Sequence, residues 1–582
     1  MAQKSKPRTS RKINYRGFEG VDLKKTHSGD ESIAFIDNFR ITDDGTLEKR
    51  CGFKKIYSSK SPDNNEIGSS YCQITGENEV SYFTQGRYVK KYDSATQQVT
   101  DIGALNEGTT GSFFFEYLDS LFVCDRQEIF KIDQDQVLPS MLYIPLYGKD
   151  WPSAFAGEKY ELPNLLTRKL AISYKLTAPA TSWLPLGDIS LDSIDAVFRN
   201  GERLNETQYQ YHEKYNAITI FEFADDDVFF AIVTFKPDAE YAAQQAELFS
   251  SHHTSLFYEL DKNNIFFWGN KTTNKVFYST LINEEYATIT DQYIEQKRFY
   301  VPVGSFFRVA AESDRIKSFI RHYDRVLIMT DSSTWITNLQ DIESGSLKIK
   351  NINSEIGCVS YDGCVRIENT LFSIGKNAIY AWSADTDELN ECNAYSISEP
   401  IRTLLENNFL SEKCSIHVHR PRNELWFYNR TKKLVWIYNY TRKAWYSISG
   451  FSPLLFLDSK KPLAFFEDNT LYCFDDSLNA DIHSNKTVEI IATLKSGELE
   501  FNSDKQKKLA TTTIRGIASG GTLTLRVLLD GKTELDYTVT PADIHSVIPF
   551  RTRSGSFSSM SFKLIASGEG AQAIHGIELI AD

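Results

Sequence analysis

The stretch LWFYNRTKKLVWIY (425–438) consists of two apolar, aromatic runs separated by a polar turn. Strand-length runs rich in Val, Ile, Phe, Tyr and Trp around a turn of Asn, Gly, Asp or Ser are typical of a β-hairpin. The same pattern occurs six more times: VSYFTQGRYVKKY (80–92), LFVCDRQEIFKI (121–132), IFFWGNKTTNKVFYS (265–279), VLIMTDSSTWIT (326–337), LFSIGKNAIYAW (371–382) and LAFFEDNTLYCF (463–474).

The spacing of these hairpins predicts the architecture. Successive copies begin 41, 144, 61, 45, 54 and 38 residues apart. A recurrence of roughly 40–50 residues with one visible hairpin per unit is typical of a β-propeller. Seven hairpins predict about six to eight blades, since one hairpin is either the centre or the edge of a blade. The single long gap leaves about 100 residues beyond a normal spacing, which predicts an inserted domain.

We therefore expect an all-β chain of several domains. The insert has its own turn at Asn200-Gly201, strands at 217–223 and 228–235, and a short helix over 238–250. Short alternating strands after residue 486 favour a β-sandwich. The expected order is a basic and polar arm (1–31), the first part of the propeller (32–145), the inserted β domain (146–252), the second part of the propeller (253–480) and the sandwich (487–582).

Charge and hydropathy limit the function. The 582 residues carry a formal net charge of −13, which argues against a general nucleic-acid binder because phosphate contacts require a Lys/Arg surplus. The basic arm is expected either to be disordered or to dock on an acidic neighbour. No apolar run follows the arm as in a signal peptide, and none is long enough for a membrane span. We expect a chain that stays in the cytosol or leaves it without a signal.

Eight scattered cysteines include no CxxC pair and are expected to be reduced, mostly buried thiols: Cys51, Cys72, Cys124, Cys358, Cys364, Cys392, Cys414 and Cys473. His417 and His419 share one strand face, but no third ligand has a suitable spacing, so an exposed strand face is favoured over a metal site. His252-His253 is expected in a solvated loop. The acidic clusters at 43–44, 225–227 and 475–476 lack the calcium-loop spacing and are expected to form turns.

No nucleophile elbow, P-loop or HExxH occurs, and no pair of carboxylates is singled out for glycoside hydrolysis. We therefore expect no catalytic residue, no cofactor and no metal. Six tryptophans lie in or beside the hairpins and are interpreted as packing between blades, with a sugar-binding platform as the alternative: Trp268, Trp335, Trp382, Trp426, Trp436 and Trp445.

Several segments resemble the β-propeller proteins of tailed-bacteriophage tails, the tubular, nozzle or hub proteins of short-tailed phages. They are NFRITDDGTLEKRCGF (38–53), NKVFYS (274–279), GSFF (304–307), IKSFIRHYDRVLIMTDSSTWIT (316–337), IGCVSYDGCVRIENTLFSIGKNAIYAWS (356–383) and KLVWIYNYTRKAWYS (433–447). The insert motif VFRNGERL (197–204) is similar to small β domains of phage tail and fibre proteins. RTRSGSFS (551–558) and IHGIEL (574–579) resemble the sandwich that ends such chains.

The resemblance implies a virion structural protein and no enzyme. Several copies, usually six, form a ring below the portal and adaptor, join fibres, spikes or further tail parts, and line the channel through which double-stranded DNA leaves. An acidic channel wall would repel the DNA backbone and bind it nowhere specifically. The alternative is a tail protein that binds or depolymerises host-surface polysaccharide, and a cellular propeller scaffold is a third hypothesis.

Overall fold

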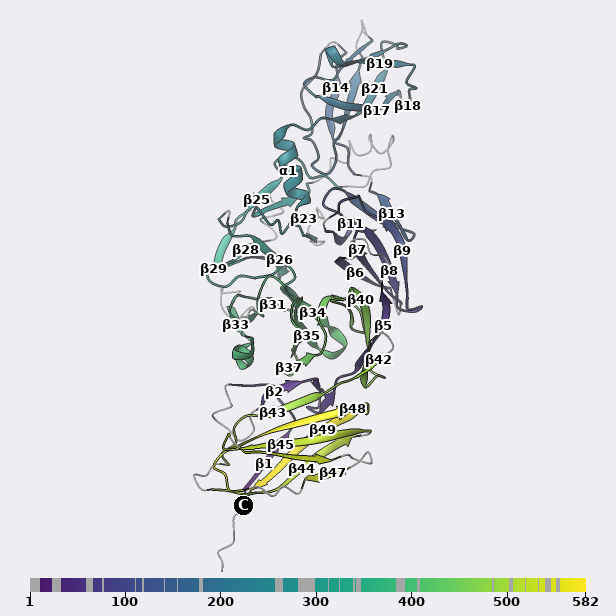
Figure 1. Cartoon of the computed structure of the whole chain (residues 1–582). Coiled ribbons are helices and arrows are strands. Elements are labelled where there is room, and N and C mark those ends of the chain that lie inside the picture. Colours follow the sequence, from purple (N-terminus) through teal and green to yellow (C-terminus); the bar gives the residue numbers. More distant parts are fainter. Residues whose placement is uncertain are drawn as a thin grey trace, which may run out of the picture. The chain divides into compact units, whose positions relative to one another are not determined.

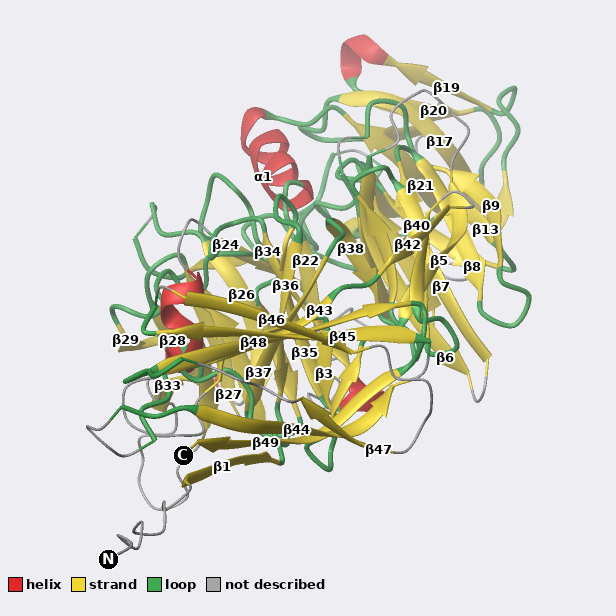
Figure 2. Cartoon of the chain, turned by 60° about the horizontal axis from the view of Figure 1, so that its bottom comes forward, coloured by secondary structure: helices red, strands yellow, loops and turns green. Residues whose placement is uncertain are grey.

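The structure is a computed structural model, and its strands far outnumber its helices. Figure 2 shows the α-helix α1 (Ala239–Phe249) and short helical turns among the strands. The structure describes residues 11–23, 33–58, 66–75, 78–109, 111–117, 120–140, 142–153, 155–176, 182–256, 265–280, 299–311, 313–323, 325–338, 341, 347–383, 393–405, 409–483, 486–501, 506–518, 520–531, 533–539, 546–550 and 555–581.

Seven four-stranded antiparallel meanders occur in the described residues, and they confirm the predicted β-propeller. The first three are β6 (Ile67–Thr75), β7 (Asn78–Gln85), β8 (Tyr88–Asp93), β9 (Gln98–Ala104); β10 (Phe113–Tyr117), β11 (Ser120–Cys124), β12 (Ile129–Asp133), β13 (Gln136–Pro139); and β22 (His253–Leu256), β23 (Ile265–Trp268), β24 (Lys275–Tyr278), β25 (Phe306–Arg308). The next two are β26 (Ile316–His322), β27 (Arg325–Thr330), β28 (Thr334–Asn338), β29 (Lys350–Asn353); and β30 (Cys364–Ile367), β31 (Thr370–Ile374), β32 (Ile379–Ser383), β33 (Asn393–Ser396). The last two are β34 (Cys414–His419), β35 (Glu424–Asn429), β36 (Leu434–Asn439), β37 (Ala444–Ser449); and β38 (Pro453–Leu457), β39 (Leu463–Phe466), β40 (Thr470–Asp475) with β5 (Gly52–Ser58).

Each of the seven sequence hairpins forms the two middle strands of one meander. In the sixth meander β35 is buried throughout and β36 at all but its first residue. By contrast, the last strands β13 and β29 of two other meanders are mainly exposed or half-buried. Because the middle strands are covered on both faces, their sequences are continuous apolar runs, whereas the sequences of the edge strands are more polar. This difference explains why only one hairpin per blade was visible in the sequence.

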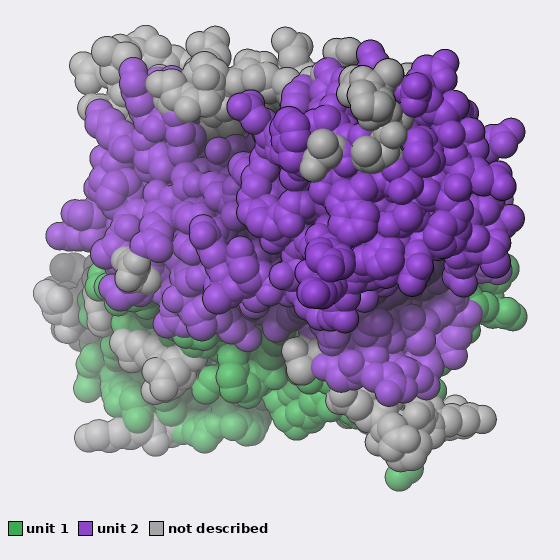
Figure 3. Space-filling view, turned by 90° about the horizontal axis from the view of Figure 1, so that it is seen from above, with its two compact units in different colours: residues 1–85, 90–100, 356–582 green, residues 86–89, 101–355 purple. Residues whose placement is uncertain are grey.

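The chain divides into two compact units, which Figure 3 shows in different colours. Unit 1 comprises residues 1–85, 90–100 and 356–582, and unit 2 comprises residues 86–89 and 101–355. Unit 1 holds three complete meanders (β30–β33, β34–β37 and β38–β40 with β5) and the C-terminal sandwich. Unit 2 holds β10–β13, β22–β25, β26–β29 and the insert.

The seventh meander is completed by a strand from the opposite end of the sequence. β5 pairs antiparallel with β40, with Gly52 opposite Asp475 and Ser58 opposite Thr470. A Cβ atom on Gly52 would lie 1.9 Å from the carbonyl oxygen of Ala480, so only glycine allows this approach. The next residue, Phe53, is fully buried among aromatic rings: Phe451, Phe466, Tyr472, Phe474 and His483.

The C-terminal sandwich includes N-terminal strands, so the expected start of the propeller at residue 32 is wrong. One sheet has the order β3 (Phe39–Ile41), β4 (Leu47–Lys49), β49 (Gln572–Ala581), β44 (Leu509–Ala518), β47 (Ser546–Phe550). The other sheet continues from β37 through β2 (Ile33–Asp37), β43 (Ala492–Ser496), β48 (Met560–Gly568), β45 (Gly521–Leu529) and β46 (Thr533–Val539). Alternating local patterns predict strands but not their partners, which explains the difference.

Two further boundaries differ from the expectation. Within the expected arm, β1 (Arg11–Arg16) pairs with β49 and buries Ile13 and Tyr15, whereas residues 1–10 and 24–32 lie outside the described part. In Figure 1, β1 and β2 lie among the C-terminal strands of unit 1. β41 (Ala480–His483) pairs with β5 and with β42 (Lys486–Glu489). The strands paired within the sandwich therefore begin at β43 rather than at residue 487.

The insert forms two sheets. The five-stranded sheet has the order β14 (Leu146–Trp151), β15 (Lys169–Lys175), β21 (Val228–Phe235), β17 (Leu191–Arg199), β18 (Glu202–Arg203), and the three-stranded sheet has the order β16 (Trp183–Pro185), β20 (Ala217–Ile220), β19 (Tyr209–His212). Asn200 and Gly201 both have positive φ, 47° and 90°, which suits the tight turn between β17 and β18. Asp238 caps α1 by accepting a hydrogen bond from the Tyr241 amide.

A buried side-chain amide joins the insert to residues 299–301, which precede β25 in unit 2. The side chain of Asn164 donates to the carbonyl oxygens of Tyr143 (2.9 Å) and Phe299 (2.8 Å). Its own oxygen accepts from the amides of Leu166 (3.2 Å) and Val301 (3.0 Å). All four hydrogen-bonding capacities of this fully buried side chain are therefore used, and two of the bonds join it to residues 135 and 137 positions later.

We expect the Phe53→Ala substitution to destabilise unit 1 strongly. Truncating a fully buried Phe removes about 3–5 kcal/mol, because the transfer energy is lost and a cavity remains. The midpoint of urea unfolding, followed by tryptophan fluorescence, measures the loss. Lys55→Thr, at the exposed position of the same strand, is the control and is expected to change stability by less than about 0.5 kcal/mol. Equal midpoints for both variants would contradict the closing role of β5.

Candidate functional site

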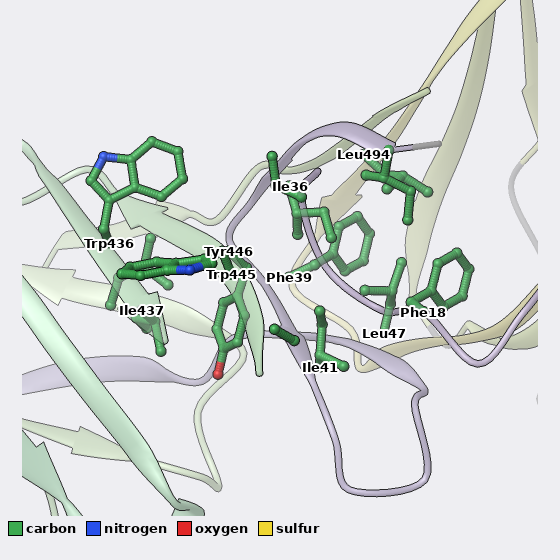
Figure 4. Packing of buried hydrophobic residues seen from close by; sticks show 14 of the residues in the cluster. Phe18, Ile36, Phe39, Ile41, Leu47, Trp436, Ile437, Trp445, Tyr446 and Leu494 are labelled. Carbon is green, nitrogen blue, oxygen red and sulfur yellow. The ribbon is translucent and has the colours of Figure 1, made fainter. Parts of the chain in front are cut away.

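A large buried hydrophobic cluster of unit 1 lies where the N-terminal segment meets the β34–β37 meander and the sandwich. Figure 4 shows this cluster of buried side chains, with residues from the N-terminal segment, the meander and β43. The labelled members are Phe18, Ile36, Phe39, Ile41, Leu47, Trp436, Ile437, Trp445, Tyr446 and Leu494. One continuous core therefore joins the N-terminal segment to the meander and to β43, which follow it by several hundred residues in the sequence.

A buried ion pair fixes this junction. Arg50 donates from both terminal nitrogens to Asp481, each bond being 2.7 Å long, and both residues are almost wholly buried. Its Nε donates to the side-chain oxygen of Asn38 at 2.8 Å. The guanidinium also lies 5.7 Å from the ring centroids of Phe53 and Phe451. Asp481 and Asn38 satisfy the buried charge, so it serves structure rather than reaction.

A second buried charge lies on β35. Glu424 has no exposed surface and accepts hydrogen bonds from the Tyr446 hydroxyl (2.6 Å) and the Trp426 indole (2.8 Å). The guanidinium Nε of Arg40, from the N-terminal strand β3, lies 3.3 Å from the same carboxylate. The N-terminal segment therefore supplies a compensating charge to the interior of a propeller blade.

The predicted exposed face at His417 and His419 is wrong, because both side chains are buried on β34. The His417 ring stacks on Phe456, with centroids 4.9 Å apart and an interplanar angle of 18°. Nδ1 of His419 lies 3.9 Å from Glu424. Burial lowers the pKa of His419 to about 3, with positive charge on Arg422 adding to the effect. Phe456 lies on β38, so packing by the next meander covers this strand face.

The pair His252-His253 does not form a solvated loop either. Nδ1 of His252 lies 2.8 Å from a guanidinium nitrogen of Arg126, and burial together with that charge lowers the pKa of His252 to about 3. His253 begins β22 and stacks on Trp268 at 4.8 Å. Both histidines therefore pack within unit 2.

The acidic clusters form turns, as predicted. Asp44 accepts from the amide of Thr46 at 3.2 Å, and Asp475 accepts from the amide of Ser477 at 3.0 Å. Asp227 accepts from the side chain of Asn200, and its other oxygen accepts from the amide of Ala224 and pairs with Arg199 at 2.7 Å. These contacts are those of Asx turns and local ion pairs.

Within the described ranges, no three His, Cys, Asp or Glu side chains lie close enough together to hold a metal ion. Seven cysteines fall in the described part, and all are free thiols. Burial raises the pKa of Cys124 to about 12, which keeps it protonated and unreactive at neutral pH. No helix in the described part is long and apolar enough to cross a membrane.

The six tryptophans of the hairpins pack inside the protein. Five are buried (Trp268, Trp382, Trp426, Trp436 and Trp445), and Trp335 is half-buried with its indole donating to the Ser333 hydroxyl at 2.8 Å. The interpretation as core packing therefore holds for these residues.

Sequence analysis missed the residues of the junction. Arg50 and Asn38 lie within residues 38–53, whose sequence pattern was recognised. That pattern did not indicate that the two side chains are buried and hydrogen-bonded to each other. Asp481 follows the last hairpin in a polar stretch, where no local pattern indicates a buried partner. Only the folded chain brings these residues together.

No protein-family model matches this chain, and no curated protein matches it. Among solved structures, it is similar to the Dos1 propeller (10% identity, 76% of this chain and 82% of that chain, TM-score 0.30). It is also similar to the Cps50 (Swd1) β-propeller domain of Myceliophteria thermophila (9% identity, 73% and 99%, TM-score 0.31). An exo-β-1,3-galactanase from Phanerochaete chrysosporium is 8% identical over 91% and 100% of the two chains, with a TM-score of 0.23. At these scores the fold assignment rests on the strand pairing above, and nothing follows about function.

We expect Arg50→Met to cost about 3–5 kcal/mol of unfolding free energy, because it leaves the buried Asp481 carboxylate without its partner. Adding Asp481→Leu should recover part of this loss, since the double variant contains no unpaired charge. Urea unfolding of the two single variants and the double variant gives the coupling free energy.

The matched control is Arg526→Met, which breaks the exposed pair with Asp536 (2.8 Å) and is expected to leave stability nearly unchanged. Additive effects of the two substitutions at the junction would contradict a direct Arg50–Asp481 interaction.

We expect His419 to make stability fall as the pH is lowered. Its pKa is about 3 in the folded chain against 6.5 for an ordinary histidine, so the unfolded state binds the proton first. The loss should begin below pH 6.5 and approach about 1.4 kcal/mol per pH unit for this one proton. Urea unfolding between pH 7 and 5 should show a shallower pH slope for His419→Gln than for the unchanged chain. Identical slopes would contradict a buried neutral His419.

Proposed function

We propose that this chain is a structural protein of a bacteriophage tail, where several copies, usually six, form a nozzle or hub ring around the DNA exit channel. The resemblance of segments 38–53, 274–279 and 316–383 motivates the proposal. The observation that carries it is the weaving of residues 11–23 and 33–58 through both the sandwich and the blades of unit 1. Local opening of such a subunit must break two domains together, which suits a permanent assembly.

The charge of the chain supports a channel that DNA passes without binding. The net charge is −13, and residues 146–252 contain sixteen Asp or Glu against nine Lys or Arg. Acidic surfaces repel the phosphate backbone and provide no sites that would hold it during release. In this proposal the protein acts by assembly rather than catalysis.

The partners in this proposal follow from the position of such a ring. Portal or adaptor proteins contact one side, and tail fibres, spikes or further tail parts contact the other. The ring assembles in the host cytoplasm and remains in the virion. Flat sheets with short, protected edges provide broad rigid surfaces for side-by-side packing of copies.

Light scattering and negative-stain imaging of the purified full chain test this proposal. We expect closed rings of about six copies, alone or with an adaptor protein, and no retention of double-stranded DNA at about 0.15 M salt. Mass spectrometry of purified phage particles should find the chain in the tail. A chain that stays monomeric under all these conditions and is absent from particles would contradict the proposal.

A further inference from the structure

The outer face of the three-stranded sheet in the insert carries two half-buried rings, Trp183 and His212, beside the exposed ring of Tyr215. Two rows of residues run across the strands β16, β20 and β19. The first row is Trp183, Thr219 and Gln210, and the second row is Pro185, Ala217 and His212. Because side chains alternate along a strand, these six share one face. Leu184 and Ile218 belong to the other face and are fully buried.

Three rings form a compact group on this face. The Trp183 and His212 rings are stacked, with centroids 5.6 Å apart and an interplanar angle of 20°. Tyr215, from the turn η2 (Glu213–Tyr215), meets Trp183 edge-on at 5.7 Å and is 61% exposed. Such exposed aromatic groups mark interaction sites, because an isolated domain gains nothing from displaying them to water.

Polar groups are interleaved with these rings. Within the described residues, the Trp183 indole N–H, the His212 ring nitrogens and the Gln210 side-chain amide make no hydrogen bond. Gln210 is exposed, and Trp183, His212 and Thr219 are half-buried. The face therefore combines flat apolar surface with donors and acceptors that are free to bind a ligand.

We propose that this face, defined by Trp183, Gln210, His212, Tyr215 and Thr219, binds a neutral pyranose glycan. A pyranose ring presents an apolar C–H face that suits an aromatic ring, and its hydroxyl rim suits amide, hydroxyl and imidazole groups. The excess of carboxylates over residues 146–252 disfavours acidic sugars by repulsion. The site is independent of ring assembly and uses none of the tryptophans of the propeller hairpins.

The insert is suited to present such a site. The buried side chain of Asn164 holds the insert in place through four hydrogen bonds. The sheet is also held on the core of the insert by Leu184 and Ile218, which are fully buried on its other face. A preorganised platform loses little conformational entropy when a ligand binds.

An oligosaccharide array probed with the labelled full chain tests the proposal. It contains neutral hexose and N-acetylhexosamine oligosaccharides beside uronic-acid oligosaccharides. We expect binding to at least one neutral member, followed by titration of that member in solution. Trp183→Ala should weaken binding about tenfold or more, and Tyr215→Ala by several-fold. Tyr395→Ala, which removes another exposed tyrosine from β33 in unit 1, should have no effect.

Thermal unfolding of each variant separates loss of binding from loss of folding, and the exposed Tyr215 provides a variant that is expected to fold normally. Three results would overturn the proposal: no binding of any neutral oligosaccharide at about 1 mM, unchanged binding by both Trp183→Ala and Tyr215→Ala, or a preference for uronic acids. A change in oligomeric state in Tyr215→Ala without any glycan binding would assign the face to contact between copies instead.

Discussion

The pairing of β5 with β40 is the constraint on which unit 1 depends. It joins residues near the start of the chain to residues more than four hundred positions later. Only glycine fits at position 52, because any side chain there would collide with the backbone of Ala480. The segment that precedes β5 runs through the sandwich as β1, β3 and β4 and beside β37 as β2. Closure of the blade and attachment of the sandwich are therefore one structural event, locked by Arg50 and Asp481.

Aromatic residues of the propeller hairpins and aromatic residues on the surface of the insert have different roles. Five of the six tryptophans in or beside the hairpins are buried in the protein, whereas Trp183 and Tyr215 lie on an outer face of the insert. In the proposed function, the propeller would serve assembly and the insert would serve recognition. That division is compatible with a tail protein that is structural in its main body and contacts the cell surface through an insertion.

Much of the fold could be predicted from the sequence because β-hairpins are local. The seven hairpins, the turn at Asn200-Gly201 and the helix after Asp238 are all determined by residues that are neighbours in the sequence. Partners of the N-terminal strands could not be predicted, since alternation at Ile33–Lys49 specifies a strand but not its sheet. For the same reason His417 and His419 were expected on an exposed face: Phe456, which stacks on His417, belongs to the next meander. The ring group of Trp183, His212 and Tyr215 in the insert has no recognisable spacing pattern in the sequence.

Hydrogen exchange of residues 52–58 in the full chain tests the central claim most directly. If β5 closes the seventh meander, its amides should exchange as slowly as those of β40 and open only when unit 1 unfolds as a whole. The exposed edge strand β42 provides the comparison for rapid exchange. Exchange of residues 52–58 at the rate of β42, with β40 still protected, would contradict the account.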